Sequence, residues 1–246
     1  MRIFFNFGRY FILMKRAFGK PEKFSIFINR CFEEINLLGV GSLGIVAIIS
    51  VFMGAVITIQ SAFNFESPLI PLYAVGVAVR DSMILEFSPA IVSLILAGKV
   101  GSSIASEIGT MRVSEQIDAL EIMGINSAGY LVLPKIVASV LFFPILVVFS
   151  MFLGIVGGYI FGLMAGVVSN YQYIMGIQYE FRPYNVVYAL IKSGVFAFII
   201  ASVPAYHGYY TSGGALEVGR SSTKGVVYSS VLILAFDLIL TKLLLV

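Results

Sequence analysis

The chain has 246 residues, of which 59% are hydrophobic and 12% are charged, and its formal net charge is +3. Soluble domains are about 45–50% apolar and about 25% charged. A mean hydropathy of +0.98 therefore excludes a water-soluble enzyme, and the same composition excludes a disordered chain. The single cysteine, Cys31, excludes a disulfide scaffold, and so small a net charge disfavours nucleic-acid binding. A polytopic membrane protein remains.

Residues 1–33 interleave Lys and Arg with Phe and Tyr. A secretory signal peptide would need an unbroken apolar stretch and a small-residue cleavage site, and neither is expected here. We predict an amphipathic helix in the membrane interface, with its aromatic rings in the acyl region and its cations at the headgroups. A disordered basic tail is the alternative.

Long stretches with few or no charges follow this segment. A helix needs about 20 apolar residues to cross a bilayer, and these stretches are too long for the strands of an outer-membrane barrel. We predict an all-α, single-domain protein over residues 1–246, with about five transmembrane helices. The shorter apolar stretch 68–79 is predicted to be interfacial or partly buried, with a re-entrant segment or a sixth span as alternatives. The five predicted spans are residues 37–63, 86–106, 134–166, 186–205 and 226–246.

The distribution of Lys and Arg predicts the orientation. Basic residues are most frequent before the first predicted span, whereas the next connection and the one after the third span carry single arginines, Arg80 and Arg182. Since cytoplasmic segments are enriched in Lys and Arg, we expect a cytoplasmic N-terminus. Five spans then leave the C-terminus on the opposite, periplasmic side.

Two series of small residues recur at four-residue spacing. Such a series places small side chains on one helix face, where two backbones can approach closely. The contact could be packing within the chain or an interface between subunits, and the spacing leaves both open. Gly101, Ala105, Gly154 and Gly158 are the candidate contact residues. The two series are Ala97, Gly101, Ala105 and Gly109, and Gly154, Gly158, Gly162 and Gly166.

The segment 107–123 is amphipathic. Val113, Ile117, Leu120 and Met123 recur at helical spacing, and the opposite face carries Arg112, Glu115, Asp118 and Glu121. The pattern predicts one cytoplasmic helix that ends near Gly124. Amphipathicity alone fits either a solvated connector or a coupling helix that docks on a soluble partner.

The sequence of this segment resembles the signature of the MlaE/YrbE permeases, which are membrane subunits of ABC lipid transporters that work with MCE proteins. The matching residues run from Glu107 through Arg112, Glu115 and Gln116 to Met123. Residues 96–102 are similar to the family's AGR-x-GS motif. Residues 85–89 resemble its RELGP motif, although Leu85 stands where the family has Arg and Ser88 where it has Gly. The resemblance extends over nearly the whole chain.

The resemblance implies a homodimer in the cell inner membrane, with each copy bearing on one cytoplasmic ABC ATPase. A periplasmic MCE-domain protein would exchange phospholipid with it, between the two membranes of a diderm envelope, and some members add a STAS-domain subunit. It also implies that ATP and Mg bind the ATPase, so that no cofactor belongs to this chain. The residues expected to couple to the ATPase are Glu107, Met111, Arg112, Glu115, Gln116, Leu120 and Met123.

A lipid cavity needs apolar walls for the tails and a few polar groups for the headgroup. On the permease hypothesis, the first span supplies most of this lining and Glu86 lies nearer the outer side. A self-contained secondary transporter or a lipid-modifying enzyme is the alternative, but these would show internal repeats or a catalytic cluster. The expected lining residues are Met53, Val56, Ile57, Gln60, Phe63 and Glu86.

Other chemistry is weakly indicated. Residues 214–221 resemble a Walker A motif, but Arg220 stands where the motif needs Lys, and the single histidine, His207, does not predict a metal site. A carboxylate at the centre of a span costs about 2.5–3.5 kcal/mol on insertion scales, so Asp237 is either functional or bonded to Ser, Thr or Lys on a neighbouring helix. Glu86 marks either the mouth of a lipid cavity or the start of a helix.

Overall fold

The computed structural model describes residues 2–19, 24–65 and 71–245. In this part of the chain the regular elements are helices. Five of the continuous helical segments are long and apolar enough to cross a membrane, which confirms the prediction of an all-α protein with five spans. They comprise Phe24–Asn64, Tyr73–Val113, Ser127–Met164, Tyr184–Tyr209 and Ala215–Leu245.

The first two spans each combine several types of helix. The first contains α2 (Phe24–Glu34), the π-helical η1 (Ile35–Gly39), the 3₁₀ turn η2 (Val40–Ser42) and α3 (Leu43–Asn64). The second contains α4 (Tyr73–Ser82), the π-helical η3 (Met83–Ile91), α5 (Val92–Leu96), the π-helical η4 (Ala97–Gly101) and α6 (Ser102–Val113).

The remaining helices are simpler. The chain begins with α1 (Arg2–Ala17), and the short α7 (Gln116–Ile122) follows the second span. The third, fourth and fifth spans are α8 (Ser127–Met164), α10 (Tyr184–Tyr209) and α11 (Ala215–Leu245), and α9 (Asn170–Gln178) connects α8 to α10.

Two predicted boundaries are wrong. Residues 1–33 do not form one helix, because α1 ends at Ala17 and α2 is continuous with the first span; residues 1 and 20–23 lie outside the described part. The segment 68–79, of which 68–70 are not described, is not a separate helix either. Its part from Tyr73 onward opens the second span, which was predicted to begin only at residue 86.

The second span can begin early because the charge of Arg80, near its start, is compensated inside the protein. Arg80 is buried, and its guanidinium donates hydrogen bonds to Asp81 at 2.8 Å and to the carbonyls of Ile177 and Tyr179 at 2.9 and 2.6 Å. A paired arginine can remain inside a helix, although an unpaired arginine would interrupt its apolar stretch. The same bonds hold α4 against α9.

The helix α9 closes one end of the bundle through an aromatic side chain. Tyr173 is fully buried, and its hydroxyl donates to the carbonyl of Ile155 at 3.0 Å. Burial raises the pKa of Tyr173 to about 12, so the hydroxyl stays protonated and remains a donor.

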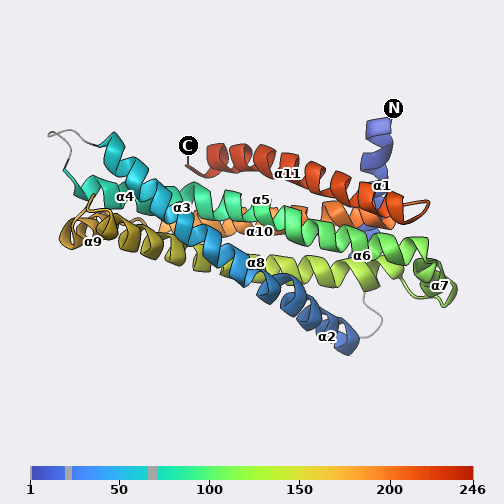
Figure 1. Cartoon of the computed structure of the whole chain (residues 1–246). Coiled ribbons are helices and arrows are strands. Elements are labelled where there is room, and N and C mark those ends of the chain that lie inside the picture. The colour runs from blue at the N-terminus through green and yellow to red at the C-terminus, as the bar shows by residue number, and fades with distance from the viewer. Residues whose placement is uncertain (1, 20–23, 66–70, 246) are drawn as a thin grey trace.

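The spans lie side by side, while α1 runs across their direction at the end of the bundle that carries α7 (Figure 1). The first span packs along α8, and α10 is central because it contacts α6, α8 and α11. Leu13, Met14 and Ala17 of α1 are buried, whereas the rings nearer its start, such as Phe4 and Phe11, are exposed. This arrangement fits the amphipathic character predicted for the start of the chain.

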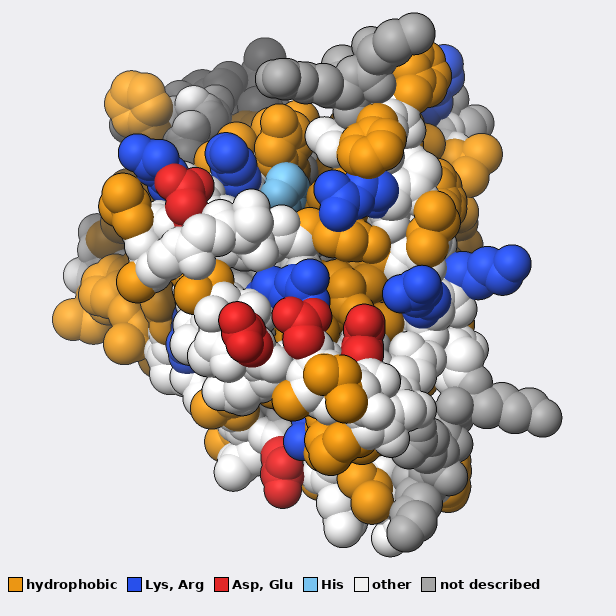
Figure 2. All heavy atoms as spheres, turned by 90° about the vertical axis from the view of Figure 1, so that its right-hand side faces the viewer, with side chains coloured by type: hydrophobic (Ala, Val, Ile, Leu, Met, Phe, Trp, Pro, Cys, Tyr) orange, Lys and Arg blue, Asp and Glu red, His pale blue; other side chains and the backbone are white. Residues whose placement is uncertain are grey.

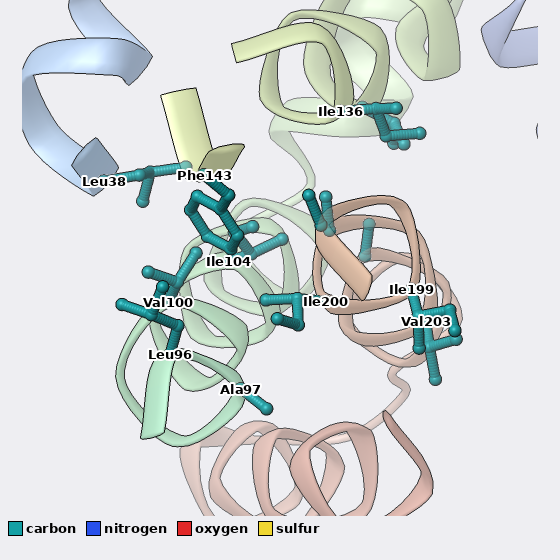
Figure 3. Close-up of a cluster of buried hydrophobic side chains, with 14 of the residues drawn as sticks. Leu38, Leu96, Ala97, Val100, Ile104, Ile136, Phe143, Ile199, Ile200 and Val203 are labelled. Carbon is teal, nitrogen blue, oxygen red and sulfur yellow. The ribbon is translucent and has the colours of Figure 1, made fainter. Parts of the chain in front are cut away.

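The largest hydrophobic core contains residues of all five spans, and Figure 3 shows part of it. Leu38 of the first span and Phe143 of α8 approach Val100 and Ile104 of the second span, and Ile200 of α10 completes the cluster. A smaller cluster at the α9 end contains Ile57, Val75, Val79, Met83, Val168 and Tyr173.

The closest contact between spans depends on glycine. A Cβ added to Gly54 of α3 would fall on the backbone of Gly154 in α8, whereas a Cβ added to Gly154 would meet the terminal methyl group of Met83, which can move. We expect Gly54→Ala to destabilise the protein by about 1–3 kcal/mol, and Gly154→Ala to have a smaller effect. Thermal unfolding of the detergent-solubilised protein measures both.

Gly44→Ala, on the same helix as Gly54, is the matched control, because nothing lies within 4 Å of the methyl group that it adds. Equal melting temperatures for Gly54→Ala and Gly44→Ala would contradict the close approach of α3 and α8.

Candidate functional site

The segment 107–123 is not one helix, contrary to the prediction. The helix α6 ends at Val113, and Glu115 adopts a left-handed backbone conformation with φ of 60° before α7 begins at Gln116. The Arg112 guanidinium donates to the Asp118 carboxylate at 2.5 Å across this break. The ion pair and the turn together fold α7 back toward the bundle.

The turn changes which side chains are available to a partner. Ile117 is fully buried, and Leu120 and Met111 pack against the main core. The apolar stripe predicted for docking therefore largely faces the protein's own interior. Ile122 and Met123, at 87% and 65% exposure, are the large apolar side chains that α7 and its end present outward.

Hydrogen bonds to the Glu121 carboxylate also fix the position of α7. The hydroxyls of Ser127 and Tyr209 each donate to the Glu121 carboxylate at 3.0 Å, which joins α7 to the start of α8 and the end of α10. The sequence placed Glu121 on a polar face but gave no sign of its partners, of which Ser127 is six residues away and Tyr209 is 88 residues away. Of the other predicted coupling residues, Glu115 and Gln116 are exposed.

The end of the bundle that carries α7 gathers charge. Figure 2 shows basic and acidic side chains together on this face, around the single histidine. Arg9 of α1 lies over the ring of Tyr210, 4.0 Å from its centroid, and His207 stacks on Tyr228. A face of this composition is suited to water and to a soluble partner rather than to lipid.

The predicted lipid-lining residues of α3 divide into two groups. Val56, Gln60 and Phe63 are exposed along one face, and Met53 is half-buried. Ile57 is buried in the core cluster at the α9 end, so it does not line a surface. The exposed stripe of α3 is extended by Ile45, Ile48, Phe52 and Ile59.

Asp237 belongs to a buried charge centre. Its Oδ1 lies 2.7 Å from Nζ of Lys192, which is fully buried in α10 and also lies 3.0 Å from Oε2 of Glu86. Of the alternatives left open by the sequence, the structure shows an ion pair between Asp237 and a lysine on the adjacent helix. Glu86 lies well inside the second span, so the interpretation of Glu86 as a helix start is wrong.

Lys135 forms a second charge centre that the sequence analysis missed. The Lys135 ammonium, 1% exposed on α8, lies 2.5 Å from Glu34 of α2 and 2.7 Å from Glu107 of α6. An isolated lysine near the start of an apolar stretch is the signal that could have found it, since a charge there needs partners. The three residues are too far apart in sequence for spacing to identify the pairs.

The small residues make contacts within the chain. An added Cβ on Gly101 would meet Pro204, and Ala105 lies against Gly208, so these two residues of the first series pack on α10. In the second series, Gly154 faces Gly54 and Met83, and Gly158 faces Thr58 and Tyr173. The structure thus shows packing of neighbouring spans at all four predicted contact residues.

Comparison with known families identifies the chain. A sequence model described as Permease MlaE matches residues 31–243. The chain belongs to the MlaE permease family. It is therefore a multi-pass membrane permease subunit.

Relatives of this permease carry consistent names. It is 35% identical over 243 residues to a "Probable ABC transporter permease protein" of Rickettsia bellii, covering 99% of this chain and 93% of the relative. It is 36% identical to a probable ABC transporter permease of Synechocystis, covering 82% and 77%. It is 33% identical to the chloroplastic protein TRIGALACTOSYLDIACYLGLYCEROL 1 of Arabidopsis thaliana, covering 85% and 60%.

The folding of α7 predicts opposite effects for two isoleucines of this MlaE permease. Ile117→Asp removes a buried side chain, which costs at least about 2 kcal/mol, and it adds an unpaired charge to the core. Ile122→Asp alters an exposed position and should change stability by no more than about 0.5 kcal/mol. Thermal unfolding of both variants in detergent compares them, and equal destabilisation would show that α7 does not fold back as described.

Proposed function

We propose that this chain is the permease of an ABC transporter that moves phospholipids between the inner and outer membranes of a diderm envelope. Family membership supports the permease role, and the relatives' designation as ABC transporter permeases implies a separate ATPase. The observation that carries the proposal is the α6–α7 turn, which is continuous with the second span at the charged end of the bundle and presents Ile122 and Met123 outward.

The ATPase docks on α7. Exposed Ile122 and Met123 supply an apolar centre for this contact, and the exposed Glu115 and Gln116 lie toward its edge. Small apolar centres surrounded by polar residues are typical of protein interfaces. Because α6 is continuous with the second span, displacement of α7 by the ATPase is transmitted directly into the membrane. ATP and Mg bind the partner, and this chain contributes no cofactor.

The α7 end of the bundle faces the cytoplasm of the inner membrane. The described basic residues near this end outnumber those near the α9 end, which include Arg80 and Arg182, as the positive-inside rule requires. The C-terminus lies at the α9 end, because the Tyr184 hydroxyl at the start of α10 donates to the carbonyl of Leu244. The N-terminus is then cytoplasmic and the C-terminus periplasmic. The basic residues near α7 are Arg9, Lys15, Arg16, Arg112, Arg220 and Lys224.

Two copies of the permease enclose the lipid between them. The exposed stripe of α3 is too long and apolar to face water, and Val56 and Phe63 provide contacts for acyl tails. Gln60 and the half-exposed Glu86, on the adjoining second span, provide polar groups for the headgroup. A periplasmic MCE-domain protein at the α9 end exchanges the phospholipid, and a STAS-domain subunit is a further candidate partner.

Reconstitution tests this function. The permease is placed in proteoliposomes with its ATPase and MCE partner, and transfer of a fluorescent phospholipid to acceptor vesicles is followed. We expect transfer that requires ATP hydrolysis. Transfer driven by an ion gradient without ATP would instead support a secondary transporter, and chemical conversion of the lipid would support an enzyme.

The purified permease alone should not hydrolyse ATP. Arg220 lacks the compact ammonium that a phosphate-binding loop requires, and residues 215–221 lie in α11 rather than in a loop after a strand. Phosphate release is measured from the permease purified without its partner. Turnover that persists after the ATPase has been removed would contradict the assignment.

Replacing both exposed apolar residues of α7 should separate the ATPase from the permease. Ile122→Asp with Met123→Asp places charge in the centre of the contact without disturbing the core, so the permease inserts normally but the ATPase no longer co-purifies. Glu115→Gln, at the edge, should cost about 0–1 kcal/mol. Full co-purification and transport by the double variant would exclude α7 as the docking site.

A further inference from the structure

Two buried lysines in different spans have the same arrangement. Lys135 of α8 and Lys192 of α10 are at most 1% exposed, and each contacts two carboxylates from two other helices. One carboxylate of each centre belongs to the second span. It is Glu107 for Lys135 and Glu86 for Lys192.

The two carboxylates of each centre differ in exposure. The side chains of Glu34 and Asp237 are only 15% and 13% exposed, whereas those of Glu107 and Glu86 are 42% and 49% exposed. An exposed carboxylate can exchange its partner for water or a polar headgroup at little cost, but a buried one cannot. In both centres the carboxylate that can leave is therefore the one on the second span.

The backbone of the second span is also irregular between these two points. The π-helical segments η3 and η4 lie in it, and Glu86 is part of η3. Pro89 in η3 has no backbone N–H to donate. A π-helical turn closes its hydrogen bond one residue later than an α-helical turn, and such turns occur often at functional sites. A change from a π-helical turn to an α-helical turn shifts the register of every residue of the span beyond that turn.

We propose that Lys135 and Lys192 are positioning residues that hold the second span at two points through ion pairs that open and re-form during transport. Glu107 and Glu86 leave together with the span, while Glu34 and Asp237 remain and keep each lysine paired. We call this pair of centres the two-point latch. It rests on the proposed function, because the force that opens it comes from the ATPase through α7 and α6.

The position of the two points suits this role. Glu86 and Glu107 are 21 residues apart, which is about 30 Å along a helix and close to the thickness of the hydrocarbon core. Glu107 lies in α6, the helix that ends at the turn to α7, so it is the first to respond to the ATPase. A lysine with no resident carboxylate would be left as an unpaired buried charge when the span moved.

Neutral variants of the leaving carboxylates test the latch. Glu107→Gln and Glu86→Gln keep the size of the side chain and an oxygen that accepts a hydrogen bond from lysine, so the complex should assemble. We expect ATP hydrolysis to continue while the phospholipid moved per ATP falls at least about fivefold, the lower end of measured coupling effects. Glu33→Gln, next to Glu34 but exposed, is the control.

A charge exchange separates a moving contact from a static one. Lys135→Glu combined with Glu107→Lys restores an ion pair between α8 and α6, but it places the cation on the second span. A static pair predicts that the exchange recovers both assembly and transport relative to Lys135→Glu alone. The latch predicts recovery of assembly only. When the span moves, it takes the cation at position 107 with it, which leaves Glu34 beside the carboxylate introduced at position 135.

The outcomes are distinct. Transport per ATP at the wild-type level in the charge-exchanged permease, or in both glutamine variants, overturns the latch. If the charge-exchanged chain fails to assemble, the glutamine variants decide, with thermal unfolding as the check that their fold is intact. Absence of lipid transfer by the wild-type complex contradicts the proposed function, whereas transfer that the glutamine variants match contradicts the latch alone.

Discussion

Hydrocarbon cannot solvate a charge, and this constraint shapes the centre of the protein. Lys135 and Lys192 are buried in α8 and α10, two helices that contact most of the other spans. Each lysine is compensated by carboxylates from other spans, so the pairing holds only if those spans lie where the structure places them. The charge of the buried Arg80 is likewise compensated, by the carboxylate of Asp81 and by two backbone carbonyls.

Close packing and ion pairing act on the same helix interfaces. The first span packs along α8, with the glycine contact between Gly54 and Gly154 toward one end and the ion pair between Glu34 and Lys135 toward the other. Small residues give the dispersion contact that lipid-embedded helices rely on. The ion pair adds register, because it forms only at one relative position of the two helices.

The α6–α7 turn has buried contacts that fix its position and side chains that remain exposed. Ile117 and Glu121 attach α7 to the bundle through a core contact and two hydrogen bonds, which leaves Ile122 and Met123 free to contact a partner. A helix that is fixed on one side and apolar at its tip can transmit a displacement. A mobile connector would absorb that displacement instead.

The sequence by itself determined the class, the five spans and the family resemblance, because these depend on hydropathy and local motifs that need no partners. It could not determine which side chains of each helix face the interior and which face outward. Helical spacing placed Leu120 and Ile57 among outward-facing residues, but Glu115 turns the chain and neighbouring spans cover Ile57. It also left Asp237 without a partner and overlooked Lys135. Those pairs join residues about a hundred positions apart or from different spans, and only the tertiary packing brings them within bonding distance.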